Sequence, residues 1–254
     1  YIKGRGNSLM ISDNKIWMYW NDGLENAPKS VQLCINSWKV QNKNYEVVVL
    51  EDNTISEWID IPKFQDTVMT IQAFSNILRI FLLSKYGGIW ADATLWCTKP
   101  VDGWVDNYSD DFFVFSNPTD SRMIASWFVK SSKDNIILKE WKDRVIDYIE
   151  NTKVVINNFW FHGLFEKIYN ENIDVKNQWD SVLKYDVNRN NRVLENPLYF
   201  SKITDDDLDD LDDDFKFGVL NKTSPMYKLG WTINWLDTKK VKFLIFKSSA
   251  AFKK

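Results

Sequence analysis

Residues 66–94 read DTVMTIQAFSNILRIFLLSKYGGIWADAT, and this stretch decides how the chain is organised. Apolar side chains occur on most sides of residues 66–86, which predicts a helix buried in the core. Gly87 and Gly88 end this helix, because glycine adopts the left-handed conformation that caps a helix without steric cost. The apolar residues that follow predict a strand that runs up to Asp92.

One narrow polar strip crosses the predicted helix. Gln72, Asn76 and Arg79 stand at positions i, i+4 and i+7, so their side chains leave the helix on the same side. Polar groups inside a core need partners, and Asp92 follows at the carboxyl edge of the predicted sheet, where open α/β folds bind ligands. Two interpretations stay open at this point. Arg79 pairs with phosphate or sugar oxygens of a ligand, or it forms a structural ion pair near a surface aspartate.

The rest of the chain predicts an α/β fold. Residues 15–20 and 45–50 are aromatic or β-branched runs typical of strands, and a helix opens between them at Pro28, since proline is favoured at a helix start. Strand, helix and strand in this order indicate a parallel βαβ unit. We expect a mostly parallel central sheet flanked by helices, in a single domain over residues 1–254. Further strands are predicted at residues 112–115 and 127–129, and further helices at residues 134–150 and 158–170.

Composition excludes several classes of protein. The chain has 254 residues, a net charge of −3, one His and two Cys. A single His cannot supply a multi-His metal site, and two Cys cannot build a zinc ribbon or an iron–sulfur cluster. The charge balance argues against nucleic acid as a partner. No apolar run reaches the roughly 18 residues that a membrane-spanning helix needs.

Four blocks of the sequence, in order, resemble the glycosyltransferases of capsular polysaccharide synthesis and of family 32. They are KIWMYWNDGLENAPKSVQLCINSW (15–38), SNILRIFLLSKYGGIWADAT (75–94), NFWFHGLFEKIY (158–169) and SPMYKL (224–229). The resemblance implies a GT-A fold, which is Rossmann-like and binds a nucleotide sugar, and retaining transfer of a hexose to an acceptor hydroxyl. It also implies a nucleotide-sugar-binding half at 14–100, an acceptor-side half at 101–235 and a basic C-terminal segment at 239–254.

The resemblance assigns roles to single positions. Arg79 matches an arginine that contacts the donor sugar and phosphates, Asp92 matches the acid beside ribose and metal, and Lys228 matches a lysine that neutralises the leaving diphosphate. An aromatic residue of the opening strand stacks on uracil, while alternation along a strand places two of the three candidates in the core. His162 matches a histidine of the middle block and is either a binding residue or a structural one. The predicted catalytic residues are Asp92, Arg79, Asn76 and Lys228, and the predicted nucleotide-sugar-binding residues are Trp17, Tyr19, Trp20, Asn76, Arg79, Gly88, Trp90, Asp92, Thr94, His162 and Lys228.

Two positions depart from the pattern of the family. Asn76 stands where the family usually has an aspartate that grips donor hydroxyls, so the negative charge is lost and one acceptor becomes a donor. Thr94 stands where many members have the second aspartate of Asp-x-Asp. The resemblance implies a divalent cation, Mn²⁺ or Mg²⁺, at Asp92. Such ions are usually held by one or two carboxylates plus substrate phosphates, and Thr94 leaves this site with one carboxylate and a hydroxyl.

The implied partners are a UDP-hexose (UDP-Gal, UDP-Glc or a UDP-HexNAc) and a saccharide or lipid-linked oligosaccharide acceptor. The implied location is the cytoplasm, or the inner face of the cell membrane as a peripheral protein. Residues 239–254 alternate lysines with apolar residues, so they either contact an anionic membrane or pack onto the domain as a last strand or helix. Residues 205–214 hold eight Asp, but they lack the glycine and glutamate of a calcium-binding EF-hand loop and are typical of a solvated acidic loop.

Two other functions compete with a transferase. A non-catalytic module that binds saccharides or nucleotide sugars would account for the 13 Trp and for the departures at Asn76 and Thr94. A glycoside hydrolase would need two carboxylates that face each other across the scissile bond, and the motifs supply only Asp92.

Overall fold

The computed structural model describes residues 14–62, 67–108, 111–157, 159–187 and 226–228. The elements of these residues follow one another as β1 (Lys15–Tyr19), α1 (Lys29–Gln41), β2 (Glu46–Leu50), α2 (Ile55–Trp58), β3 (Val68–Met69), α3 (Ile71–Tyr86), β4 (Gly88–Ala91), β5 (Leu95–Cys97), the 3-10 helices η1 (Val101–Gly103) and η2 (Val105–Asn107), β6 (Phe112–Thr119), β7 (Arg122–Ser131), α4 (Ile136–Glu150), β8 (Val154–Val155), α5 (Trp160–Glu171), α6 (Ile173–Ser181), β9 (Tyr185–Asp186) and β10 (Met226–Lys228).

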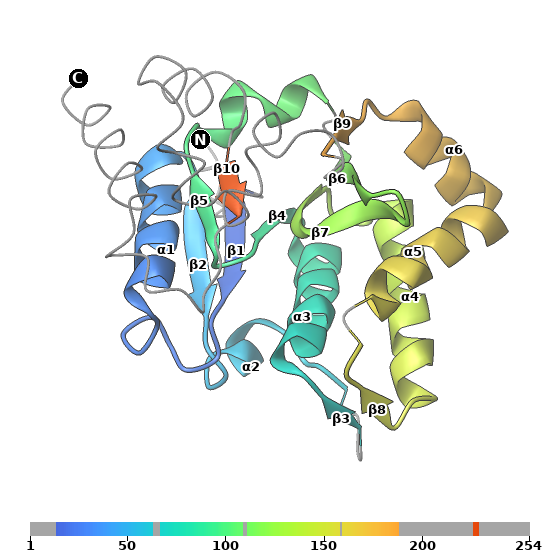
Figure 1. The fold of residues 1–254 in the computed structure, drawn as a ribbon, viewed down its shortest axis with the longest axis horizontal. Coiled ribbons are helices and arrows are strands. Elements are labelled where there is room, and N and C mark those ends of the chain that lie inside the picture. Colours follow the sequence, from blue (N-terminus) through green and yellow to red (C-terminus); the bar gives the residue numbers. More distant parts are fainter. Residues whose placement is uncertain (1–13, 63–66, 109–110, 158, 188–225, 229–254) are drawn as a thin grey trace, which may run out of the picture.

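A six-stranded sheet with the order β2-β1-β4-β7-β6-β9 forms the centre of the fold (Figure 1). The pairs β1–β2, β1–β4 and β6–β9 are parallel, whereas β7 is antiparallel to both of its neighbours. Helices cover both faces, with α1 on one side and α3 to α6 on the other (Figure 1). The prediction of an α/β fold with a mostly parallel sheet flanked by helices is therefore confirmed.

Side chains that alternate along the strands divide the core in two. In β1, Trp17 and Tyr19 pack among α3 to α6, while Ile16 and Met18 pack against α1. This is the two-residue period of a strand that is buried on both faces. All five residues of β1 are buried, which explains why the run is continuously apolar apart from its first residue.

Helix α3 begins later than the sequence predicts. Val68 and Met69 form β3, which pairs in parallel with β8, so they do not belong to the helix. Thr70 is the N-cap, and its side chain accepts a hydrogen bond from the Ala73 amide at 3.1 Å. Such a cap satisfies one of the amides that a helix start leaves without a partner. The predicted start at residue 66 was wrong because apolar periodicity alone does not separate a strand from the first turn of a helix.

The second half also contains more regular structure than predicted. The runs at 112–115 and 127–129 are parts of a long antiparallel hairpin, β6–β7, whose register shifts twice. Residues 116–119 of β6 read SNPT, a sequence typical of turns, so the apolar pattern predicts only the first half of this strand. Helix α6 was not predicted; the side chain of Asn172 caps it by accepting from the amides of Asp174 and Val175.

Several predicted segments lie outside the described residues. These are the acidic run at 205–214 and the basic segment at 239–254. Among the helices of the described ranges, none has the length and apolar character that crossing a bilayer requires.

Gly87 sets the turn from α3 into β4. Its φ is +69°, and a Cβ atom at this position would lie 2.9 Å from the backbone nitrogen of Lys133. Both the left-handed conformation and the close approach require glycine here. The turn delivers β4 directly into the sheet between β1 and β7.

We expect Gly87→Ala to lower the free energy of unfolding by about 1–3 kcal/mol, because the new Cβ adds backbone strain and a contact with a backbone atom that cannot move away. Urea denaturation measures this. The matched control is Gly103→Ala. Apart from the glycine and its two chain neighbours, no atom of the described residues lies within 4 Å of the new methyl group, and the change is expected to stay within about 0.5 kcal/mol. Equal stabilities of the two variants would contradict the role of Gly87.

Candidate functional site

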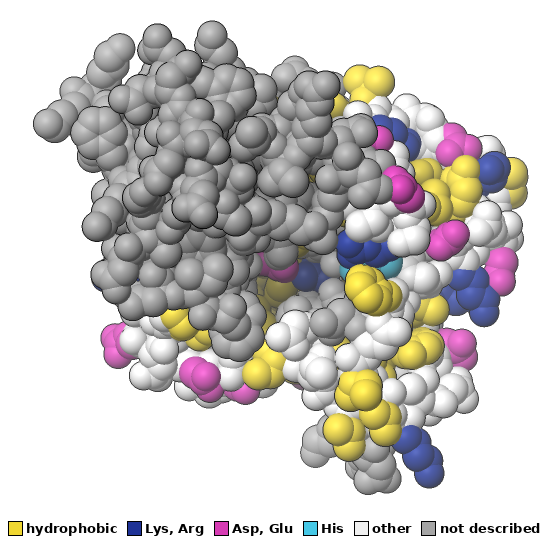
Figure 2. Space-filling view, in the orientation of Figure 1, with side chains coloured by type: hydrophobic (Ala, Val, Ile, Leu, Met, Phe, Trp, Pro, Cys, Tyr) yellow, Lys and Arg dark blue, Asp and Glu magenta, His cyan; other side chains and the backbone are white. Residues whose placement is uncertain are grey.

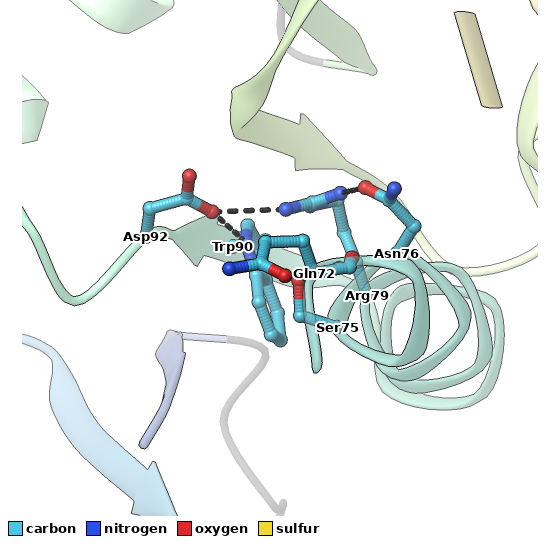
Figure 3. Close-up of polar contacts among 6 residues, drawn as sticks. All are labelled: Gln72, Ser75, Asn76, Arg79, Trp90 and Asp92. Carbon is cyan, nitrogen blue, oxygen red and sulfur yellow. Dashed lines mark hydrogen bonds and ion pairs between the residues drawn. The ribbon is translucent and has the colours of Figure 1, made fainter. Parts of the chain in front are cut away.

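The candidate site lies where α3 meets the carboxyl end of β4. Arg79 projects from α3, and Asp92 is the first residue after β4 (Figure 3). Nη2 of Arg79 lies 2.9 Å from Oδ1 of Asp92, and the two side chains are 3% and 26% exposed. The ion pair therefore joins a fully buried cation to a carboxylate that reaches the surface.

Aromatic rings and an amide complete the surroundings of Arg79. Its guanidinium lies over the rings of Trp90 and Phe161, at 4.8 and 5.6 Å from their centroids, and Nη1 donates to Oδ1 of Asn76. Nε is buried and has no hydrogen-bond partner among the described residues. A buried donor without a partner is rare in folded proteins and calls for an explanation.

The charge state of Arg79 reflects two opposing effects. Burial lowers the pKa of the guanidinium from its usual value, and the charge and hydrogen bond of Asp92 act in the opposite direction. An arginine side chain stays protonated in proteins. The site therefore holds a permanent positive charge shielded from water.

Asp92 is fixed through both its side chain and its backbone. The indole of Trp90 donates at 2.9 Å to Oδ1 of Asp92, the same oxygen that accepts from Arg79. The Asp92 amide donates to the Trp127 carbonyl at 2.9 Å, and its carbonyl accepts from Leu95 at 2.9 Å. These bonds extend the β4–β7 pairing by one residue and then turn the chain, which holds the acid at the edge of the sheet.

The polar strip on α3 runs from solvent to the buried ion pair. Gln72 is exposed, while Asn76 and Arg79 are buried. Figure 3 shows the three side chains on the same side of α3, with the Arg79 guanidinium between Asn76 and Asp92. The predicted i, i+4, i+7 geometry is confirmed. Gln72 was absent from the predicted binding residues, although its spacing from Asn76 and Arg79 indicates that it lies on the same side of the helix.

A second polar contact lies at the same edge of the sheet. Strands β1 and β2 run parallel with Tyr19 beside Leu50, and the hydroxyl of Tyr19 donates to Oδ1 of Asp52 at 2.5 Å. Burial is the main cause that raises the pKa of the Tyr19 phenol, and this hydrogen bond raises it further. The phenol therefore stays protonated and remains a donor. Asp52 was missed by sequence reasoning, although an acid two residues past a strand end is a usable signal. Trp20 follows β1 and is half-buried.

Two predicted binding residues are not brought to this edge. Trp17 is 0% exposed, its indole donates to the Gly87 carbonyl at 3.0 Å, and its ring packs on Trp58 and Tyr86. It is a core residue and offers no ring face to a nucleobase. This agrees with the alternation of side chains along a strand, which places two of the three aromatic candidates in the core. Gly88 is the first residue of β4, about 13 Å from Asp92 at 3.3 Å per strand residue.

The remaining predicted residues are placed to different degrees. Thr94 is half-buried in the turn after Asp92. Lys228 ends β10, where its backbone pairs with Leu95 of β5; its side chain lies outside the described part of the structure. His162, on α5, lines a cavity of about 510 Å³.

The described residues do not contain a preformed metal-binding site. Within them, no three His, Cys, Asp or Glu side chains are grouped so that they could hold an ion. Asp92 is the carboxylate at the edge of β4, and an ion there would need further ligands from a substrate or water.

We expect Asp92→Asn to lower the free energy of unfolding by about 2–4 kcal/mol, because it leaves the buried Arg79 charge without its carboxylate. Chemical denaturation of the variant and the parent gives this difference. The matched control is Asp106→Asn, which breaks a surface ion pair with Lys130 and is expected to cost less than about 1 kcal/mol. The ion pair of Arg79 would be energetically unimportant if both variants unfolded alike.

Comparisons with known proteins find relatives among the glycosyltransferases. The chain is 24% identical over 154 residues to O-glycosyltransferase braB of Annulohypoxylon truncatum and 24% identical over 150 residues to glycosyltransferase afumC of Aspergillus fumigatus. These matches cover 52% and 50% of this chain but only 37% and 38% of the relatives. Among solved structures, PaToxG glycosyltransferase aligns over 66% of this chain and 74% of its own with 19% identity and a TM-score of 0.44.

The sequence model of one protein family extends over nearly the whole chain. It is described as "Capsular polysaccharide synthesis protein" and matches residues 5–247. The match includes α3, β4 and the ion pair between them. The chain therefore belongs to the capsular polysaccharide synthesis protein family.

Proposed function

We propose that the chain is a retaining glycosyltransferase of the GT-A type, which transfers a hexose from a UDP-sugar to a saccharide acceptor in the synthesis of a surface polysaccharide. The observation that carries this proposal is the Arg79–Asp92 pair at the carboxyl edge of β4. A buried guanidinium with one donor that lacks a partner among the described residues suits an anionic oxygen that arrives with a ligand. The names of the curated relatives, both glycosyltransferases, support the same class of reaction.

Each group of the site has a role in this scheme. Arg79 stabilises the negative charge that develops on the leaving diphosphate. Asp92 holds Arg79 in place through Oδ1, and its carboxylate is the group that would hold a divalent cation, Mn²⁺ or Mg²⁺, together with oxygens from the substrate or water. The cation, when bound, adds Lewis-acid stabilisation of the same diphosphate. At the adjacent strand end, the half-buried Trp20 would contact the nucleoside, while the buried Tyr19 would act through its hydroxyl, which is bound to Asp52. Lys228, the last residue of the strand that pairs with β5, would neutralise the leaving diphosphate.

Retention of configuration follows in this proposal from attack on the same face as departure. The acceptor hydroxyl oxygen bonds to the anomeric carbon as the bond to the diphosphate breaks, and the electron pair leaves with the diphosphate. The hydroxyl proton passes to a diphosphate oxygen. An oxocarbenium-like transition state needs no nucleophile from the protein. This agrees with a site that consists of the Arg79 guanidinium, the Asp92 carboxylate and aromatic rings.

A non-catalytic binding protein of the same fold is the second candidate, and Asn76 favours it. Its amide oxygen is engaged by Arg79, in the position where the family resemblance places an aspartate. A binding protein would retain donor affinity and transfer nothing. We expect Asn76→Asp to keep Arg79 in place, because a carboxylate also accepts from the guanidinium, and to raise the rate of donor turnover.

We expect UDP and at least one UDP-hexose to raise the Tm by about 5–10 °C at hundredfold Kd, in a thermal-shift panel with and without Mn²⁺, because a ligand that binds only the folded state stabilises it. GDP-mannose is the control donor. The shift should shrink in EDTA and in Asp92→Asn, whereas Asp106→Asn should respond like the parent. An absence of any shift with all UDP-sugars would overturn the proposed donor class.

We expect Arg79→Lys to lower kcat by about 100-fold or more with a smaller effect on KM, because lysine keeps the charge but loses the planar fork that stabilises the transition state. Initial rates of transfer or donor hydrolysis provide the measurement, and NMR of the product gives its anomeric configuration. Inverted product, or transfer at the parent rate after Asp92→Ala, would rule out this mechanism.

A further inference from the structure

The cavity beside His162 lies between the tip of the β6–β7 hairpin and the first turns of α5. Its volume is about 510 Å³, within the range of about 300–1,000 Å³ that is typical of small-molecule sites. Figure 2 shows this face, where basic and hydrophobic side chains surround the cyan histidine. Its wall combines Thr119, Arg122, Met123, Phe159, His162 and Glu166.

Arg122 and Phe159 form a fixed surface within this wall. The Arg122 guanidinium lies over the Phe159 ring at 5.1 Å, and its Nε donates to the Thr119 hydroxyl at 3.3 Å. Phe159 is nevertheless 58% exposed, although large aromatic side chains are usually buried. An exposed aromatic ring at the mouth of a cavity offers an apolar platform to a ligand.

The polar groups of the cavity carry both signs of charge. Arg122 is cationic, Glu166 is an exposed carboxylate, and the hydroxyl of Thr119 is neutral. A diphosphate would gain from Arg122 but would be repelled by Glu166. A neutral ligand with many hydroxyl groups can donate to the carboxylate, accept from the guanidinium and place its C–H face against Phe159. These are the properties of a sugar ring.

The cavity and the Arg79–Asp92 pair share α5 as a common wall. Phe161 of this helix lies under the Arg79 guanidinium, and the next residue, His162, lines the cavity. Strand β7 links the same two places, because it starts at the cavity and continues to Phe128, which pairs with Ala91 just before Asp92. A ligand in the cavity would therefore lie on the Asp92 side of the sheet.

We propose that this cavity binds a hexopyranose ring of the acceptor saccharide, with Phe159 as the stacking platform and Arg122 and Glu166 as its hydrogen-bond partners. The assignment to the acceptor rests on the proposed transferase function. The presence of a saccharide site does not, and the two can be tested apart.

The test uses saturation-transfer NMR of the whole chain with a panel of neutral methyl hexopyranosides and disaccharides, and a thermal shift with UDP in parallel. We expect Phe159→Ala and Glu166→Gln each to weaken saccharide binding by about fivefold or more. The matched control is Leu183→Ala, which removes an apolar side chain of similar exposure (65%) outside the cavity. We expect this variant to bind saccharides like the parent, and all three variants to keep the UDP-induced shift.

The outcomes separate the two proposals. Saccharide signals that are absent, or equal in Phe159→Ala and the parent, overturn the cavity as a sugar site whatever UDP does. Loss of the UDP-induced shift in Phe159→Ala assigns the cavity to the donor and overturns its acceptor role. Saccharide binding that depends on Phe159 while no variant or parent responds to UDP supports the sugar site and overturns the proposed UDP-sugar donor.

Discussion

Transfer of a guanidinium from water into a protein interior costs several kcal/mol, and the structure offsets this cost at Arg79 with the carboxylate of Asp92. The requirement determines much of the surrounding architecture. Gly87 has to turn the chain tightly so that β4 enters the sheet next to α3, and β4 has to end where the acid can reach back to the helix. Trp90 and Phe161 then enclose the cation. The arrangement keeps a buried positive charge beside a carboxylate that reaches the surface.

The fold was largely predictable because its decisive signals are local. A buried helix, a glycine pair and an apolar strand follow one another within 66–94, and an apolar strand, a helix and a second strand precede them. Prediction from local patterns failed where a strand depends on a pairing partner that is distant in the sequence. Val68 and Met69 form a strand instead of helix because β8 pairs with them. The turn-like residues 116–119 belong to β6 because β7 pairs with this strand. Neither partner can be inferred from neighbouring residues.

The candidate site was predictable to the same extent. Arg79 and Asn76 could be assigned to one side of a helix from their spacing, and Asp92 to a strand end. The sequence could not distinguish the faces of β1, where Trp17, Tyr19 and Trp20 all qualify as aromatic stacking residues; only packing shows that Trp17 is enclosed by Trp58 and Tyr86. The contact of Phe161 with Arg79 could not be predicted either, because it joins segments that are distant along the chain.

Helix α5 touches the buried guanidinium through Phe161 and the cavity through His162. Consecutive residues of a helix cannot move independently, so a ligand that displaces α5 at one of these places also changes the surroundings of the other. Thermodynamic reciprocity then applies: the factor by which an occupant of the cavity alters affinity at the edge of β4 equals the factor in the opposite direction. If both regions bind ligands as proposed, α5 is the element through which one ligand would alter the affinity for the other.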